Sequence, residues 1–224
     1  MLINTTNYHS ILQELSNKAT LVAVSKTKPN DAIAELYALG QKDFGENYVQ
    51  ELVDKAALLP QDIRWHFIGH LQSNKVKYIA PFVYLIHGVD SFSLLKEINK
   101  QAQKQNRVID CLLQMHIAQE ETKFGLNAAE LYEIIEAINV QPLPHVCIKG
   151  LMGMASFTSD TAIIENEFKQ LYIQFEALKK IQCPGIDCTI LSMGMSSDYT
   201  IAVAQGSNMV RIGSLLFGER NYNK

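Results

Sequence analysis

Lys26 directly follows a short apolar run, and its position suggests covalent chemistry. The run from Leu21 to Ser25 has the composition of a strand, and the residues after Pro29 have helical spacing. In α/β folds the carboxyl ends of strands carry the active site. A lysine amine that loses its proton there can attack an aldehyde and form a Schiff base. Because most lysines are solvated surface groups, this position alone does not establish the chemistry.

Two further segments have the composition of an anion site. Ser196 and Ser197 directly precede a segment with helical spacing, and the free N–H groups at a helix start form a ready phosphate site. Gly213 and Ser214 follow another apolar run, and the glycine allows close approach of the backbone. The alternative interpretation of the first two serines is helix N-capping, which contributes about 1 kcal/mol and is compatible with anion binding.

Short apolar runs that alternate with amphipathic segments must position these residues. Eight such runs predict strands: Leu21–Val24, Asp43-Phe44, Trp65–Ile68, Val83–His87, Cys111–Ile117, Val146–Leu151, Thr189–Ser192 and Met209–Ile212. Strand–helix alternation predicts a parallel sheet, and eight repeats close into a single α/β domain, a (β/α)8 TIM barrel. An open doubly wound sheet is the alternative. The segment from Tyr8 to Asn17 predicts an extra helix before the first strand, at the lower mouth or on the side.

In such a barrel the ends of the strands meet, and polar loops follow them, including residues 120–125 after the fifth strand. Arg211 lies within the eighth strand and is expected to point inward. It then needs an anionic partner or an acceptor, because an unpaired buried charge is costly. His66, in the third strand, is interpreted as a hydrogen-bonded histidine of the barrel interior.

Composition and charge argue against nucleic-acid-binding, secreted and membrane-spanning proteins. The chain has 224 residues, 47% of them hydrophobic, and a net charge of -3, which suits one domain over residues 1–224 and gives no basic surface for nucleic acid. No secretory signal begins it, and no apolar stretch approaches the roughly 20 residues that cross a membrane. The four cysteines form no Cys-x-x-Cys pair, so a reduced, cytoplasmic protein is expected. His66 and His70 lack the additional ligands of a metal site.

Six long motifs occur in order over nearly the whole chain: Val24–Pro29, Phe44–Glu51, Trp65–Lys75, Gly150–Met154, Leu191–Asp198 and Val210–Ser214. They resemble the pyridoxal phosphate homeostasis protein family, the YggS- or PROSC-like proteins. The resemblance implies a single barrel like the N-terminal domain of alanine racemase. It also implies pyridoxal 5′-phosphate (PLP) as the cofactor.

The resemblance assigns roles to seven residues. It implies that Lys26 holds PLP as an internal aldimine, which is a Schiff base. The phosphate-binding loops correspond to four residues here: Ser196, Ser197, Gly213 and Ser214. Arg211 is implied beside the phosphate or the pyridine ring, and Asn47 near the ring face or its substituents.

Three functions remain open. The resemblance implies a non-catalytic PLP carrier without established turnover, with apo forms of PLP-dependent enzymes as candidate partners. The alternative is a PLP-dependent, racemase-like enzyme. The resemblance implies that alanine racemase uses a lysine on one face of the cofactor and a tyrosine from a second β domain on the other. That domain is expected to be absent, because the sequence ends soon after the eighth strand, which leaves Tyr48 or His70 as the opposing base. The third is a barrel for a phosphorylated metabolite, with Lys26 as an electrophile. We expect a monomer.

Overall fold

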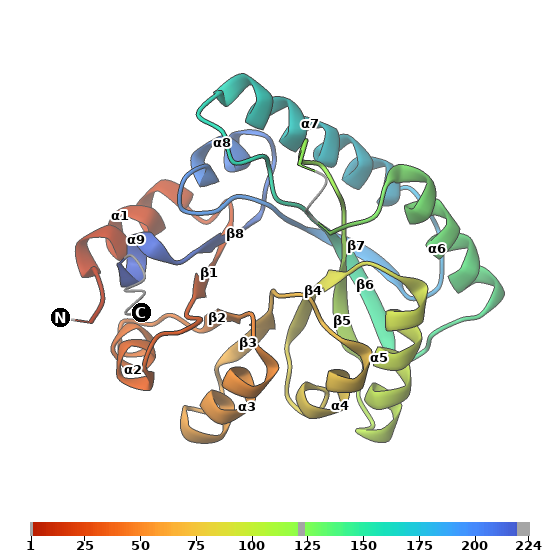
Figure 1. The fold of residues 1–224 in the computed structure, drawn as a ribbon, viewed down its shortest axis with the longest axis horizontal. Helices are drawn as coiled ribbons and strands as arrows, with labels where there is room; N and C mark the ends of the chain where they lie inside the picture. The colour runs from red at the N-terminus through yellow and green to blue at the C-terminus, as the bar shows by residue number, and fades with distance from the viewer. Residues whose placement is uncertain (1, 121–123, 219–224) are drawn as a thin grey trace.

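The fold is a closed barrel of eight parallel strands in sequential order, surrounded by helices (Figure 1). The computed structural model describes residues 2–120 and 124–218. The strands are β1 (Thr20–Val24), β2 (Asp43–Glu46), β3 (Arg64–Phe67), β4 (Leu85–Val89), β5 (Ile109–Gln114), β6 (Val146–Met152), β7 (Ile186–Ser192) and β8 (Met209–Ile212). Pairing of β1 with β8 closes the barrel, which confirms the predicted TIM barrel over the open sheet.

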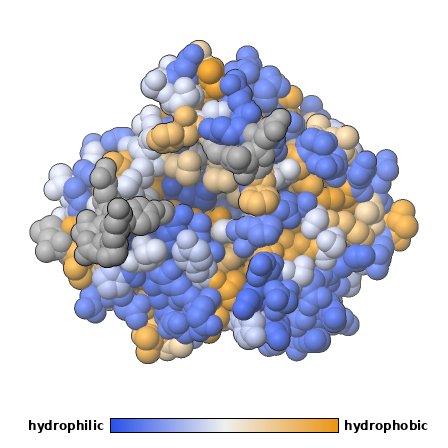
Figure 2. Space-filling view, in the orientation of Figure 1, coloured by the Kyte–Doolittle hydropathy of each residue, from blue (hydrophilic) through white to orange (hydrophobic). Residues whose placement is uncertain are grey.

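Helices follow the strands and cover their outer faces. They are α2 (Asn30–Ala38), α3 (Val49–Leu58), α4 (Val76–Ile79), α5 (Phe92–Lys104), α6 (Ala128–Val140), α7 (Thr161–Leu178), α8 (Tyr199–Ala204) and α9 (Ser214–Phe217), with a 3-10 turn η1 (Ser73–Lys75) before α4. Among the described helices, none is long and apolar enough to cross a membrane. The face in Figure 2 is mostly hydrophilic, with hydrophobic residues scattered between polar ones.

The extra N-terminal helix is present and packs on the side of the barrel. It is α1 (Thr5–Leu15), and it lies beside α9 in Figure 1. Asn4 caps α1 by accepting from the Asn7 N–H, and the Asn4 N–H donates to Leu216 O at 2.7 Å. The Asn7 Nδ2 donates to Leu215 O at 3.0 Å, so α1 is fastened to α9 by two hydrogen bonds.

The sheet separates two apolar clusters. The larger one lies between the outer faces of the strands and the helices. The smaller one fills the barrel interior with Val22, Leu85, Leu112, Met152 and Met209. Because successive side chains of a strand point to opposite faces, Arg211 points inward like Met209, whereas Val210 and Ile212 point outward. The expected inward direction of Arg211 is confirmed.

Gly150 lets β6 and β7 approach closely where their register shifts. Its φ is +143°, and a Cβ at this position would lie 1.9 Å from the Ile190 carbonyl oxygen. Any other residue would therefore add a backbone collision to the conformational strain. Gly40 shows the conformational strain without a collision, because its φ is +100° and a Cβ there would meet nothing within 4 Å.

We predict that Gly150→Ala destabilises the fold more than Gly40→Ala does. Gly40→Ala should cost only backbone strain, about 1–3 kcal/mol. Gly150→Ala must also move a strand, so its cost should lie above that range. Urea unfolding of both variants and the wild type measures the difference. Equal costs for the two variants would contradict the close approach of β6 and β7.

Candidate functional site

A cavity of about 380 Å³ opens at the carboxyl ends of the strands. Its lining includes all seven residues that the sequence singled out: Lys26, Asn47, Ser196, Ser197, Arg211, Gly213 and Ser214. Apolar side chains complete the wall: Val24, Ile68, Met154, Phe157 and Met195. The structure thus brings the predicted residues together, and their assignment to a cofactor stays a prediction.

Hydrogen bonds fix the two residues that flank Lys26 in the chain, Ser25 and Thr27. The Ser25 hydroxyl donates to Glu46 Oε1 at 2.6 Å, and the Ser25 carbonyl accepts from Lys55 Nζ at 2.8 Å. On the other side, the Thr27 N–H donates to Glu51 Oε1 at 2.6 Å. Thr27 adopts a left-handed conformation with φ of 65°, which is uncommon for a β-branched residue. These bonds stabilise the turn that directs the Lys26 side chain into the cavity.

The anchors belong to an ion cluster of Glu46, Lys55 and Glu51, of which Glu46 and Lys55 are buried. Lys55 Nζ lies 2.8 Å from Glu46 Oε1 and 2.6 Å from Glu51 Oε1. The side chains of Lys55 and Glu46 are 6% and 0% exposed. Burial raises the pKa of Glu46, and the attraction of Lys55 opposes this effect. The carboxylate therefore depends on Lys55 for its compensation.

The two serine loops lie side by side and are hydrogen-bonded to each other. Ser196 and Ser197 lie between β7 and α8, and the Ser196 hydroxyl accepts from the Gly213 N–H at 3.3 Å. A Cβ at Gly213 would lie 3.2 Å from the Val24 carbonyl oxygen, so the glycine allows this loop to pack against the end of β1. Ser214 begins α9. Hydroxyl and N–H donors from two loops therefore converge where an anion can bind.

Arg211 contributes a positive charge at the cavity. Its Nη1 donates to Ser192 O at 2.9 Å and to Ser192 Oγ at 2.6 Å, and its Nη2 donates to Gly153 O at 3.0 Å. Burial lowers the pKa of Arg211 to about 10, and the nearby Asp198 carboxylate acts in the opposite direction. The expected acceptors are thus supplied by β7 and the loop after β6, and the expected negative charge by Asp198.

Asn47 gives the cavity a buried acceptor. Its Oδ1 is buried and makes no hydrogen bond with the described residues. Buried polar atoms are almost always satisfied, so an orphaned oxygen in a cavity lining indicates a bound group with a donor. An amine, a set of anion donors and this acceptor together fit a phosphorylated aldehyde that also carries a hydrogen-bond donor.

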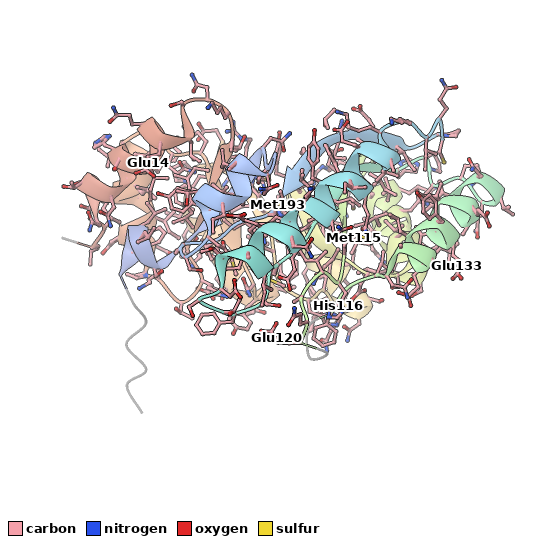
Figure 3. All side chains as sticks on the ribbon, turned by 90° about the horizontal axis from the view of Figure 1, so that it is seen from above. Glu14, Met115, His116, Glu120, Glu133 and Met193 are labelled. Carbon is pink, nitrogen blue, oxygen red and sulfur yellow. The ribbon has the colours of Figure 1, made fainter. Side chains whose placement is uncertain are left out.

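The loop after β6 contributes Met154 and Phe157 to the wall of the cavity and is hydrogen-bonded to the loop after β5. The His116 Nε2 lies 2.9 Å from the Glu120 carbonyl oxygen, and the two residues lie close together in Figure 3. Glu120 Oε1 accepts from the Phe157 N–H at 2.9 Å. Phe157 lines the cavity although it is 91% exposed overall. Of the predicted loop at 120–125, residues 121–123 lie outside the described part of the chain.

Sequence reasoning missed several residues of the site. Lys28 lines the cavity, and its Nζ donates to the carbonyl oxygens of Phe217 and Gly218. The Lys55 cluster was also missed, although Glu51 and Lys55 are four residues apart on α3 and this spacing signals a helical ion pair. Within the described ranges, no group of three or more metal-binding side chains is found.

The chain is similar to known proteins over nearly its whole length. The family model for alanine racemase, N-terminal domain, matches residues 5–221. A pyridoxal phosphate homeostasis protein of Pasteurella multocida is 41% identical over 207 residues, which cover 91% of this chain and 88% of the relative. The structure of PipY from Synechococcus elongatus with PLP bound has a TM-score of 0.86 and 37% identity, covering 95% of this chain and 99% of PipY.

Alanine racemases themselves are distant. The enzyme of Clostridium difficile has a TM-score of 0.74 at 17% identity, and the match covers 98% of this chain and 57% of the racemase. Likeness at this level of identity shows the barrel fold alone.

We predict that Lys55→Met destabilises the protein by about 3 kcal/mol, because it leaves Glu46 buried without its cation. The control is Lys42→Met, which removes the partner of Asp62 from an exposed pair and should change little. Urea unfolding provides the measurement. Adding Glu46→Gln to Lys55→Met should recover part of the loss, and a Lys55→Met variant as stable as Lys42→Met would refute the role of the cluster.

Proposed function

Since the chain belongs to the alanine racemase N-terminal domain family and, within it, to the pyridoxal phosphate homeostasis proteins, we propose that it binds PLP. Its role is to hold the cofactor in the cytoplasm and so maintain the PLP supply, without turnover of a substrate. One observation carries the proposal: an amine, two serine loops and a buried arginine line a single cavity. This set matches the two reactive ends of PLP.

Each residue then has a defined task. Bound PLP supplies an aldehyde that condenses reversibly with an amine, and a phosphate that needs donors. Lys26 Nζ is the amine that forms the covalent bond. Ser196, Ser197 and Ser214 supply donors for the phosphate, and Gly213 lets the backbone approach it. Arg211 and Asn47 orient the remainder of the group, Arg211 as a donor and Asn47 Oδ1 as an acceptor.

The placement of the alternative bases supports a carrier over a racemase. A racemase needs a second proton-transfer group opposite the lysine. Neither Tyr48 nor His70 belongs to the described lining of the cavity. Tyr48 is 58% exposed, and His70 stacks on Phe124 with ring centroids 4.9 Å apart. Both are thus directed elsewhere, which leaves Lys26 without an opposing base from these positions.

The partners follow from the same role. A carrier has to release its cofactor, so apo forms of PLP-dependent enzymes are the proposed recipients. We also propose a monomer. The most exposed large hydrophobic residues, Leu58, Val140 and Phe157, come from different elements and so do not mark a single contact face.

We predict that the purified protein with PLP is yellow and that Lys26→Ala removes most of the visible absorbance. Lys75→Ala is the matched control, because Lys75 is an exposed lysine in the loop after β3. Borohydride reduction followed by peptide mapping should find the adduct on Lys26 and not on Lys28.

Other outcomes separate the alternatives. A colourless protein that does not bind added PLP would favour a barrel for another phosphorylated metabolite. Racemisation of an amino acid well above the rate with free PLP would favour the enzyme. Transfer of PLP to an apo-enzyme faster than free release would support the carrier.

A further inference from the structure

A line of hydrogen-bonded polar side chains crosses the barrel interior. Arg211 Nη1 donates to Ser192 Oγ at 2.6 Å, and Ser192 Oγ lies 3.2 Å from His87 Nδ1. His87 Nε2 lies 2.9 Å from His66 Nδ1, and His66 Nε2 lies 3.0 Å from Asp43 Oδ1. The interpretation of His66 as a hydrogen-bonded barrel histidine is confirmed. The five side chains are termed the barrel relay.

The barrel relay connects the two mouths of the barrel. Its members come from β8, β7, β4, β3 and β2. His66, His87 and Ser192 have no exposed surface. Asp43 begins β2, and with Arg64 it lines a second cavity at the amino ends of the strands. The Arg64 side chain is 45% exposed. One end of the relay therefore lies at the candidate site, and the other end is close to water at the opposite mouth.

The hydrogen bonds of the relay have one consistent direction. A guanidinium can only donate, so Ser192 Oγ accepts from Arg211 and its own hydrogen is available for His87 Nδ1. His87 then carries its proton on Nε2 and donates to His66 Nδ1. His66 carries its proton on Nε2 and donates to Asp43. The same assignment follows from the Asp43 end, because an ionised carboxylate only accepts. A cation and an anion thus select one tautomer of each histidine.

The relay requires both histidines to be neutral. Burial lowers the pKa of His66, against the opposing effect of Asp43, and burial lowers the pKa of His87 even further. A second proton on His66 Nδ1 would face the N–H of His87 Nε2, and a second proton on His87 Nδ1 would face the hydroxyl hydrogen of Ser192. Asp43 remains ionised, because hydrogen bonds from Arg64 and His66 outweigh its burial and lower its pKa.

Among the described residues, charged, polar and aromatic groups from several elements face the two rings. His66 faces Asp43, Arg64 and the Tyr84 ring, whose centroid is 5.4 Å from that of the imidazole. His87 faces His66, Ser192 and the Arg211 charge.

We propose that the barrel relay positions the Arg211 guanidinium for the cofactor, so that the charge of Asp43 at the far mouth sets cofactor affinity. This inference rests on the proposed binding of PLP. The mechanism is the orientation of one hydroxyl. While His87 accepts the Ser192 hydrogen, the lone pairs of Ser192 Oγ are turned to Arg211 and hold it in place. Without the relay the hydroxyl can rotate, and the guanidinium loses one of its fixed acceptors.

Two variants test the coupling through the equilibrium dissociation constant for PLP. Ser192→Ala removes the link beside Arg211, and Asp43→Asn removes the anion at the far mouth. Ser192→Ala should weaken binding roughly tenfold, the effect of losing one hydrogen bond to a charged group. Asp43→Asn leaves that hydrogen bond in place and should weaken binding by a smaller factor. The control is Ser207→Ala, because Ser207 is also buried and, among the described residues, its hydroxyl bonds to the carbonyl oxygens of Leu191, Met193 and Met209. This control should leave affinity almost unchanged.

A second readout needs no cofactor. In the apo-protein labelled with ¹⁵N-histidine, NMR should show neutral Nε2–H tautomers for His66 and His87, and Asp43→Asn should shift the signals of both. A neutral Nδ1–H tautomer at either position would overturn the relay. Equal PLP affinity in Asp43→Asn and Ser207→Ala would overturn the coupling. A wild-type protein that binds no PLP would refute the proposed function and the coupling, whereas the tautomers would still test the relay.

We also predict that the stability of the fold decreases as the pH falls below about 6.5, the ordinary histidine pKa. The unfolded chain binds protons there and the native relay does not, so the unfolding equilibrium constant should rise up to about a hundredfold per pH unit for two histidines. His66→Gln keeps a donor and an acceptor but cannot titrate, so it should leave a slope of about tenfold per pH unit.

Denaturant unfolding between pH 7 and pH 5.5 measures both slopes, with the exposed His9→Gln as control. An unchanged slope in His66→Gln would contradict a neutral His66.

Discussion

The pairing of β1 with β8 is the constraint on which the site depends. Ala23 lies beside Ile212 in this parallel register, so the residues that follow the two strands must emerge next to each other. Lys26 and Ser214 are far apart in sequence, yet closure brings both to one cavity. An open sheet would place the first and last strands at different positions and separate the amine from the anion donors. Barrel closure therefore assembles the cofactor site.

The buried cations of this fold are tolerated because each one has several acceptors close to it. Lys55 is enclosed by two carboxylates, and Arg211 by three acceptors and a nearby Asp198. Desolvation of these ions is costly, so they contribute little net stability compared with apolar packing. Their effect is to fix geometry around Lys26 and at the cavity floor. Stability comes mainly from the large apolar cluster outside the strands.

Much of the fold was predictable because its periodicity is strong. The eight apolar runs predict the eight strands of the barrel, and the site residues predicted from the sequence line one cavity. The short helices α4 and α9 were missed, because four residues give no helical period. The start of β7 was also placed too late, since Ile186 and its neighbours alternate between exposed and half-buried positions. Contacts such as His66 with His87 were not predictable, because they depend on which inward side chains meet across the barrel.

The bonds between α1 and α9 have a mechanical consequence for the ligand loop. Asn7 reaches a carbonyl 208 positions away in the chain, directly behind the turn that contains Ser214. Helix α1 therefore restrains that turn from outside the barrel. Any molecule that binds to this helix, including a fused tag, can therefore increase the mobility of the turn that contains Ser214 without entering the cavity. Occupancy of the cavity would, in turn, be felt at the start of the chain.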